Sequence, residues 1–207
     1  MDTVRSIFQV HLIDTNESQV HLTDTNESET KVLIVEDEQE LADMYAAYLH
    51  DDFIVETVYS GQEAFEALDE SVDIVLLDRR MPVVSGNEVL AFIEEKGYDC
   101  RIAMVTAVNP DFDIIDLRID DYLVKPVSRT DVLETVDRMI TLEAYNERMR
   151  ELTSKKLKRN VLELEKTKAE LQENDGFEQL TAEIESLETE VESITDDLDP
   201  ESLQRSL

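Results

Sequence analysis

Carboxylate side chains follow two separate apolar runs of this sequence. Asp78 comes directly after Val72–Leu77, a mostly apolar run rich in β-branched residues, and Glu36 and Asp37 come directly after Val32–Val35. Runs of this length and composition predict buried strands. If the two strands are neighbours in a parallel sheet, the acids meet at one edge, where their mutual repulsion favours a bound hard cation such as Mg²⁺.

Two later runs end in side chains of a different kind. Thr106 ends the run Arg101–Thr106 and offers a hydroxyl donor, while Lys125 follows Tyr122–Val124 and offers a fixed positive charge. An attacking carboxylate, a cation, a hydroxyl and an ammonium group are the parts that stabilise a phosphoryl group in transfer. We therefore predict that Asp78 is a phosphate acceptor.

The elements that would position these side chains alternate between strand and helix, which predicts an α/β fold with a doubly wound parallel sheet. Strands are predicted at Val32–Val35, Ile54–Tyr59, within Ser71–Pro82, at Arg101–Thr106 and at Tyr122–Val124. Helices are predicted at Gln39–His50, Gln62–Leu68 and Asn87–Glu95, with a weak helix that ends near Asp120 and a helix start at Ser128.

Four short motifs in register resemble those of the receiver domain of two-component response regulators. The resemblance covers about Thr30–Ile140 and is carried by Val35-Glu36-Asp37-Glu38, Leu77-Asp78-Arg79-Arg80-Met81-Pro82, Met104-Val105-Thr106-Ala107 and Tyr122-Leu123-Val124-Lys125-Pro126. It implies a flavodoxin-like (βα)5 sheet of strand order 2-1-3-4-5. It also implies a signalling switch rather than a turnover enzyme.

The resemblance implies a role for each residue of the site. Asp78 would take a phosphoryl group from a histidine kinase. The carboxylates of Glu36, Asp37 and Asp78, with the backbone carbonyl of Arg80, would hold Mg²⁺. Hydrolases of the haloacid dehalogenase type also use an aspartate nucleophile, but they require a second aspartate at the position that Arg80 occupies, so that class is disfavoured.

The remaining site residues would respond to the phosphate. Thr106 and Lys125 would engage the phosphoryl oxygens, and Tyr122 would turn inward as Thr106 moves toward the phosphate. The resemblance also implies a cis peptide bond at Lys125–Pro126.

Helical spacing without further strands fills the chain after Asp131. A coiled-coil seam is predicted from apolar residues spaced by four and three, namely Leu180, Ile184, Leu187, Val191, Ile194 and Leu198. An opposing seam is predicted at Leu157, Val161, Leu164 and Leu171, with Asn174-Asp175-Gly176 as the link between two antiparallel helices. Residues 141–207 resemble the HalX-type helical extension found after receivers in salt-loving archaea, and we expect them to be the output or interaction domain.

The two predicted helices carry opposite charges. Arg148–Lys168 is rich in bases, whereas Glu178–Asp199 carries acids and no base. Opposite charges suit pairing within a hairpin or between two chains, so a homodimer and an unknown downstream protein partner both stay open. An alternative function is a DNA-binding transcriptional regulator that uses the basic helix 148–168, although no groove-reading motif is present.

The remaining expectations concern the whole chain. It has 50 acids against 19 bases, a net charge of -31, which is typical of salt-loving organisms and disfavours anionic membranes and general nucleic-acid binding. A single cysteine, Cys100, and the lack of a long apolar run predict a cytoplasmic protein. Residues 1–29 form a polar leader with a tandem ten-residue repeat, and metal binding by its His11 and His21 is disfavoured.

The charge of -31 predicts that the fold depends on salt. At low ionic strength the acids repel one another over longer distances, so the folded chain should loosen, and molar KCl should restore it. Circular dichroism in dilute buffer and in molar KCl measures this change. Identical spectra in the two solutions would contradict the salt-adapted interpretation.

Overall fold

The computed structural model describes residues 30–107, 110 and 112–198 of the chain. The tandem repeat, the predicted leader of residues 1–29 and its two histidines lie outside the described residues. None of the helices within the described ranges is long and apolar enough to cross a membrane.

A five-stranded parallel sheet forms the centre of the first half, in the order β2-β1-β3-β4-β5. The predicted doubly wound α/β fold and its strand order are therefore confirmed. The strands are four to six residues long, and their bounds are β1 Lys31–Val35, β2 Ile54–Val58, β3 Ile74–Leu77, β4 Arg101–Thr106 and β5 Asp121–Val124.

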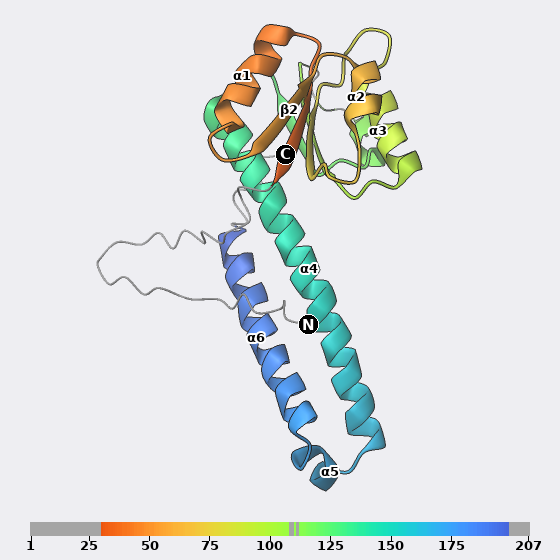
Figure 1. The fold of residues 1–207 in the computed structure, drawn as a ribbon, viewed down its shortest axis with the longest axis vertical. Helices are drawn as coiled ribbons and strands as arrows, with labels where there is room; N and C mark the ends of the chain where they lie inside the picture. Colours follow the sequence, from red (N-terminus) through yellow and green to blue (C-terminus); the bar gives the residue numbers. More distant parts are fainter. Residues whose placement is uncertain (1–29, 108–109, 111, 199–207) are drawn as a thin grey trace, which may run out of the picture.

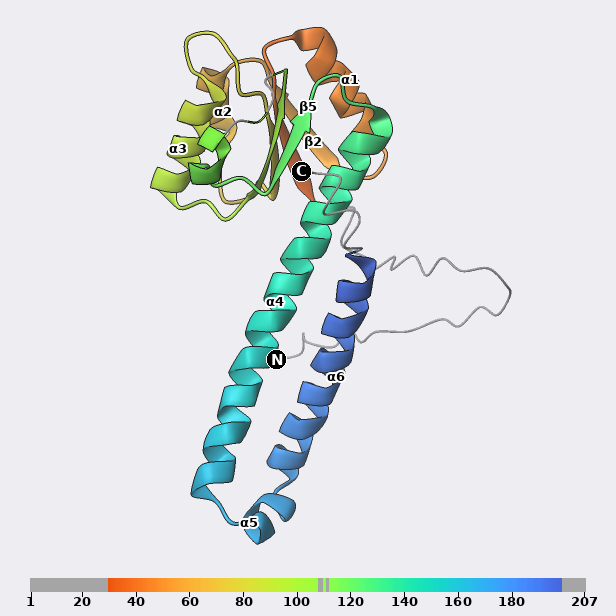
Figure 2. The same ribbon diagram turned by 180° about the vertical axis from the view of Figure 1, so that it is seen from behind.

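Helices cover both faces of the sheet (Figures 1 and 2). On one face lie α1 (Gln39–Leu49) and the start of α4 (Arg129–Glu165), and on the other lie α2 (Gly61–Ala67) and α3 (Gly86–Lys96). Alternate residues of each strand point to opposite faces, so β1 sends Val32 and Ile34 into one core and Leu33 and Val35 into the other. Burial on both faces explains why the inner strands β1, β3 and β4 are mostly apolar, whereas the edge strands β2 and β5 are less buried and carry more polar residues.

The connection between β4 and β5 is a short 3₁₀ helix, η2 (Phe112–Asp116), where the sequence predicts a weak helix. Phe112 and Ile115 are exposed there. Leu117 and Ile119, which follow η2, pack against the core instead.

Helix α4 runs without interruption from the receiver-like half into the C-terminal half. It begins at a capping box, in which the Ser128 hydroxyl accepts from the Asp131 backbone N–H and the Asp131 carboxylate accepts from the Ser128 backbone N–H. Val132, Val136 and Met139 pack into the core of the sheet, and the helix then continues beyond the sheet to Glu165. The predicted helix start at Ser128 is confirmed.

Helix α6 (Asp175–Asp197) returns antiparallel to α4 and completes a hairpin (Figure 1). Leu152 of α4 packs against Ile184 and Leu187 of α6, so the predicted seam of α6 is confirmed at these positions. Opposite charges flank this contact, with ion pairs Arg148–Glu190 at 3.0 Å, Lys155–Glu183 at 2.8 Å and Lys156–Glu188 at 2.7 Å.

Two details of the predicted hairpin are wrong. Leu157, Val161 and Leu164 do not face α6 but are exposed, because the ion-paired bases of α4 occupy the contacting face instead. The link between the two long helices is also longer than Asn174-Asp175-Gly176, because α4 ends at Glu165 and a short helix α5 (Lys168–Gln172) follows. Asn174 instead caps α6, since its side chain accepts a hydrogen bond from the Phe177 backbone N–H at 3.0 Å.

Arginine pairs hold α4 to the sheet where the helix leaves it. Arg138 of α4 pairs with Asp121, the first residue of β5, whose side chain is 3% exposed. On the adjacent strand, Arg101 pairs with Asp120 at 2.7 Å and donates from Nε to Glu143 of α4 at 2.8 Å. These contacts fix the direction in which α4 projects.

The difference in burial between two arginine pairs of α4 predicts a difference in stability. Arg138→Met leaves the buried Asp121 carboxylate without its arginine partner, and the free energy of unfolding should fall by about 3 to 5 kcal/mol. Arg148→Met is the matched control on the same helix, because its partner Glu190 is 40% exposed, and it should cost at most about 1 kcal/mol. Urea unfolding followed by circular dichroism measures both, and equal losses would contradict the assignment of Arg138–Asp121 as a buried pair.

Candidate functional site

The three predicted carboxylates meet at the carboxyl ends of β1 and β3. These strands are parallel neighbours with Val35 opposite Leu77, so the residues that follow them lie at one edge of the sheet. One carboxylate oxygen from each of Glu36, Asp37 and Asp78 lies within 4.8 Å of the other two. Glu36 and Asp78 are buried and Asp37 is half-buried, so a group bound here is reached from the side of Asp37.

Lys125 lies between two of these carboxylates. Its Nζ is 2.6 Å from Oε2 of Glu36 and 2.7 Å from Oδ2 of Asp78. The backbone N–H of Lys125 donates to the carbonyl of Thr106 at 2.8 Å, which fastens the end of β5 to the end of β4. The Lys125–Pro126 peptide bond is cis.

Burial and hydrogen bonding change the protonation of these groups. Burial raises the pKa of Glu36 to about 7, although the hydrogen bond from Lys125 opposes this shift. Burial alone would lower the pKa of Lys125, but the hydrogen bonds to Asp78 and Glu36 outweigh it and leave that pKa raised. Lys125 is therefore a permanent cation in a site that contains more negative charge than it can neutralise.

The loop after Asp78 is held in place by main-chain contacts. The backbone N–H of Arg80 donates to Oδ1 of Asp78 at 3.0 Å, and the backbone N–H of Gly86 donates to the carbonyl of Arg79 at 3.0 Å. Met81 is buried in the core beneath the loop. The family resemblance implies that the Arg80 carbonyl is a metal ligand, and that role stays a prediction. The N–H of Arg80 orients the carboxylate of Asp78.

Gly86 was not predicted as a site residue, yet it sets how closely α3 approaches Asp78. A Cβ atom at this position would lie 2.3 Å from the carbonyl oxygen of Asp78 and 2.8 Å from the Cα of Arg79. Such distances are too short for any side chain, so only glycine fits without moving the loop. The sequence did offer one indication of this role, namely a glycine eight residues after Asp78 at the start of a predicted helix.

Thr106 lies on β4 and Tyr122 on its neighbour β5, where Tyr122 stands two residues before the carboxyl end of the strand. Thr106 is the last residue of β4 and is completely buried. Tyr122 lies opposite Met104 on β5 and is half-buried against the core under α2 and α3. Their placement is compatible with the predicted switch, and their movement stays a prediction.

The donor set fits a hard divalent cation. Mg²⁺ takes oxygen ligands and is usually held by one or two carboxylates together with water and phosphate oxygens. Glu36, Asp37 and Asp78 supply carboxylate oxygens only, and no histidine or cysteine joins them within the described ranges. A softer metal would find none of its preferred ligands in this cluster.

Two family models match this chain. The response regulator receiver domain matches residues 32–137, about half of the chain. The HalX domain matches residues 141–206.

Curated relatives match the first half of the chain. A Haloferax volcanii protein that is named as a transcriptional regulator is 50% identical over 121 residues, which are 58% of this chain and 21% of that protein. The transcriptional regulatory protein CutR of Streptomyces coelicolor is 38% identical over 111 residues, 51% of each chain. The matched region therefore spans about half or less of these relatives. The Haloferax match fits the prediction of a salt-loving archaeal source.

A solved structure agrees with the fold. A signal receiver domain from Vibrio parahaemolyticus superposes with a TM-score of 0.53 at 23% identity, covering 57% of this chain and 95% of that domain. This likeness supports the doubly wound sheet described above.

The close approach of Gly86 to Asp78 predicts a sensitive position. Gly86→Ala should push the Asp78 loop outward and weaken Mg²⁺ binding by on the order of tenfold or more, because small misplacements of a functional group are costly. Calorimetric titration with MgCl₂ measures this. Gly97→Ala is the control: its φ of 71° makes alanine cost about 1 to 2 kcal/mol of stability, but its Cβ meets no atom within 4 Å and Mg²⁺ binding should not change. Equal Mg²⁺ affinity in the two variants would show that Gly86 does not position Asp78.

Proposed function

This chain belongs to the family of response regulator receiver domains, and on that premise we propose that Asp78 accepts a phosphoryl group from the phosphohistidine of a histidine kinase. The observation that carries the proposal is the position of Lys125, whose ammonium group contacts both Asp78 and Glu36 beside a third carboxylate. Buried charges in this arrangement are costly for a purely structural role, but they suit a site that must receive a phosphoryl group.

In the proposed step, a carboxylate oxygen of Asp78 attacks the phosphorus atom. The P–O bond to Asp78 forms as the P–N bond of the phosphohistidine breaks, and the imidazole leaves and takes up a proton. The backbone N–H of Arg80 and the ammonium group of Lys125 orient the attacking carboxylate. Afterwards Lys125 and the Thr106 hydroxyl engage the phosphoryl oxygens.

Glu36, Asp37 and Asp78 would hold Mg²⁺ in this site, together with the carbonyl of Arg80. When bound, the ion supplies positive charge that offsets the negative charge of the phosphoryl group. Burial raises the pKa of Glu36 despite the hydrogen bond from Lys125, which supports this proposal because a cation beside the carboxyl would favour its charged form.

The output would pass along α4. We assign residues 30–140 to the receiver and residues 141–207 to a HalX-like output or interaction domain. Phosphorylation would shift Thr106 and Tyr122, and Tyr122 is adjacent to Asp121, which is paired with Arg138 of α4. The chain would then act as a switch without turnover, and a downstream protein would recognise the hairpin.

The DNA-binding alternative is less well supported. The bases Arg148, Lys155 and Lys156 of the segment 148–168 form ion pairs with acids of α6, which offsets the positive charge that phosphates of DNA would need. The transcriptional names of the relatives are compatible with this alternative, so it stays open for the assembled regulator.

Phosphorylation can be measured directly on the intact chain. Incubation with acetyl phosphate and MgCl₂ should add about 80 Da, as expected for one phosphoryl group. Asp78→Asn should abolish the addition, and Lys125→Met should slow it by about 100-fold or more, because a charge that stabilises the transferring group is lost. Mass spectrometry of the whole protein measures the added mass in the wild type and in both variants.

Asp73→Asn is the matched control, since Asp73 is an exposed aspartate at the opposite end of β3. It should be labelled as fast as the wild type. Labelling of Asp78→Asn at the wild-type rate would show that another residue is the acceptor.

A further inference from the structure

The loop after Asp78 contains a residue with an unfavourable backbone conformation. Val83 has a φ of 69°, and in the part of the chain that the structure describes it is the sole non-glycine residue with a positive φ. The backbone N–H of Val84 donates to the carbonyl of Pro82 at 2.8 Å, so these residues form a γ-turn centred on Val83. A γ-turn of this hand is rare and strained, and a β-branched valine suits a positive φ poorly.

Val83 itself gains little from this conformation. Its side chain is 92% exposed, so burial of the isopropyl group does not offset the unfavourable backbone. A strained residue persists only where the surrounding structure dictates its conformation. The contacts that keep Val83 at a positive φ are therefore those of its neighbours in the loop.

Val84 is held against the first turn of α2. Gly61 is the buried first residue of that helix, and a Cβ atom on it would lie 2.6 Å from both Cγ1 and the carbonyl oxygen of Val84. Only glycine leaves room for this contact. Val84 also packs against the core beneath α2 and α3, which lie on the same face of the sheet (Figures 1 and 2). Val84 is therefore the residue that joins the loop to α2.

The loop transmits this contact to Asp78. Gly86 follows Val84 by two residues, and its N–H donates to the carbonyl of Arg79 at 3.0 Å, so the two ends of the loop are joined. Gly86 also leaves no room for a side chain beside the carbonyl of Asp78. Within the closed loop, the N–H of Arg80 donates to the carboxylate of Asp78. A shift of Val84 would therefore move the groups that orient the phosphoryl acceptor.

We propose that Val84, in contact with Gly61, is a positioning residue for the phosphorylation of Asp78. It holds the loop in place against the strain at Val83. Without the contact to Gly61, Val83 would return to a negative φ, and the N–H of Arg80 would no longer orient the carboxylate. This inference rests on the proposed function and adds the contact that keeps the acceptor in its reactive position.

Amide hydrogen exchange, followed by NMR on the intact chain, tests whether Val84 holds the loop. Val84→Ala should speed the exchange of the Arg80 and Gly86 N–H groups by about tenfold, because the strain at Val83 then opens the loop. Val83→Gly combined with Val84→Ala should bring exchange back to within about threefold of the wild type. Glycine adopts a positive φ about as readily as a negative one, so the loop no longer needs to be held against strain.

The rate of labelling by acetyl phosphate in saturating MgCl₂ tests the positioning of Asp78. Val84→Ala should be labelled about tenfold more slowly than the wild type, because a small misplacement of a reacting group is costly. The double variant with Val83→Gly should recover most of the rate. A residue that only fills space in the core would change stability without changing this rate.

Val55→Ala is the matched control within the receiver. Val55 is a half-buried valine of β2 that packs against the core on the opposite face of the sheet. The change removes the same atoms as Val84→Ala and should lower the midpoint of urea unfolding. It should leave both the exchange of the loop and the rate of labelling unchanged.

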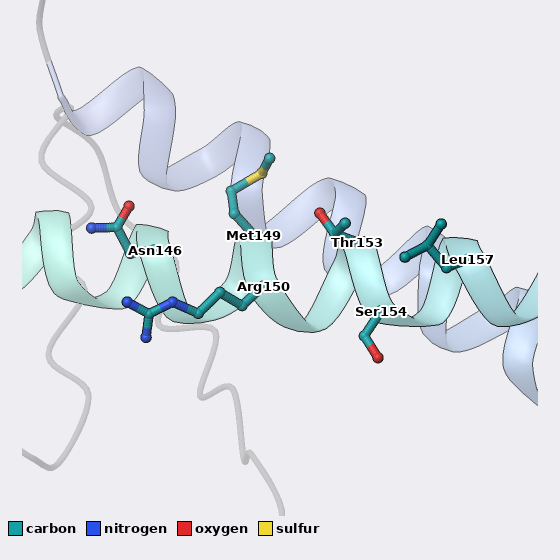
Figure 3. A pocket seen from close by; sticks show the side chains of 6 residues that line it. All are labelled: Asn146, Met149, Arg150, Thr153, Ser154 and Leu157. Carbon is teal, nitrogen blue, oxygen red and sulfur yellow. The ribbon is translucent and has the colours of Figure 1, made fainter.

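A second control lies in the hairpin. Met149 lines a shallow hollow on α4 and is directed toward α6 (Figure 3). Met149→Ala should loosen the packing of α6, whereas exchange of the Arg80 and Gly86 N–H groups should stay at the wild-type rate.

Three results would overturn the inference. The first is a Val84→Ala variant that exchanges and is labelled like the wild type. The second is a double variant with Val83→Gly that is no closer to the wild type than Val84→Ala alone. The third is faster exchange of the loop in either control. Labelling of Asp78→Asn would instead refute the proposed function, and hydrogen exchange would still decide whether Val84 holds the loop.

Discussion

Lys125 lies between two buried carboxylates, with its ammonium nitrogen 2.6 Å from Glu36 and 2.7 Å from Asp78. Without that cation, acids at the ends of β1 and β3 would repel one another in a place that water hardly reaches. The sheet order brings these strands together and places β5, which Lys125 directly follows, two strands from β3. The fold, the loop after Asp78 and the end of β5 thus serve one requirement, which is to keep opposite charges in register at one edge.

The sheet and the site could be predicted because their signals are local. Buried strands such as β3 consist almost wholly of apolar residues, and the polar residue that ends each run marks the edge where a ligand binds. Glu36, Asp37, Asp78 and Lys125 were found in this way, and the structure brings them together. Gly86 is different: its importance lies in the distance of its absent side chain from the carbonyl of Asp78, which spacing alone does not reveal.

The hairpin shows where sequence patterns are insufficient. Apolar spacing identifies a seam, but it does not say whether that seam faces another part of the chain or the outside. On α6 the pattern identified the packed face, whereas on α4 it identified Leu157, Val161 and Leu164, which are exposed. The contacting face of α4 has a single buried leucine, Leu152, followed by long basic side chains whose aliphatic parts cover α6 while their charges reach its acids. A search for hydrophobic spacing misses such residues, because it counts lysine and arginine as polar and not as part of a packed face.

Helix α4 is one unbroken rod of 37 residues, about 55 Å long, that starts beside the acidic edge of the sheet and ends at the tip of the hairpin. It is held near Arg138 and Glu143, so in the proposed switch the part beyond these contacts would act as a lever with its pivot at the base of the sheet. The lever arm after Glu143 is about 33 Å long, and a tilt of about 5° at the pivot displaces its end by about 3 Å. A rearrangement too small to disturb the sheet would in this way produce a displacement about the size of an atom at the tip of the hairpin.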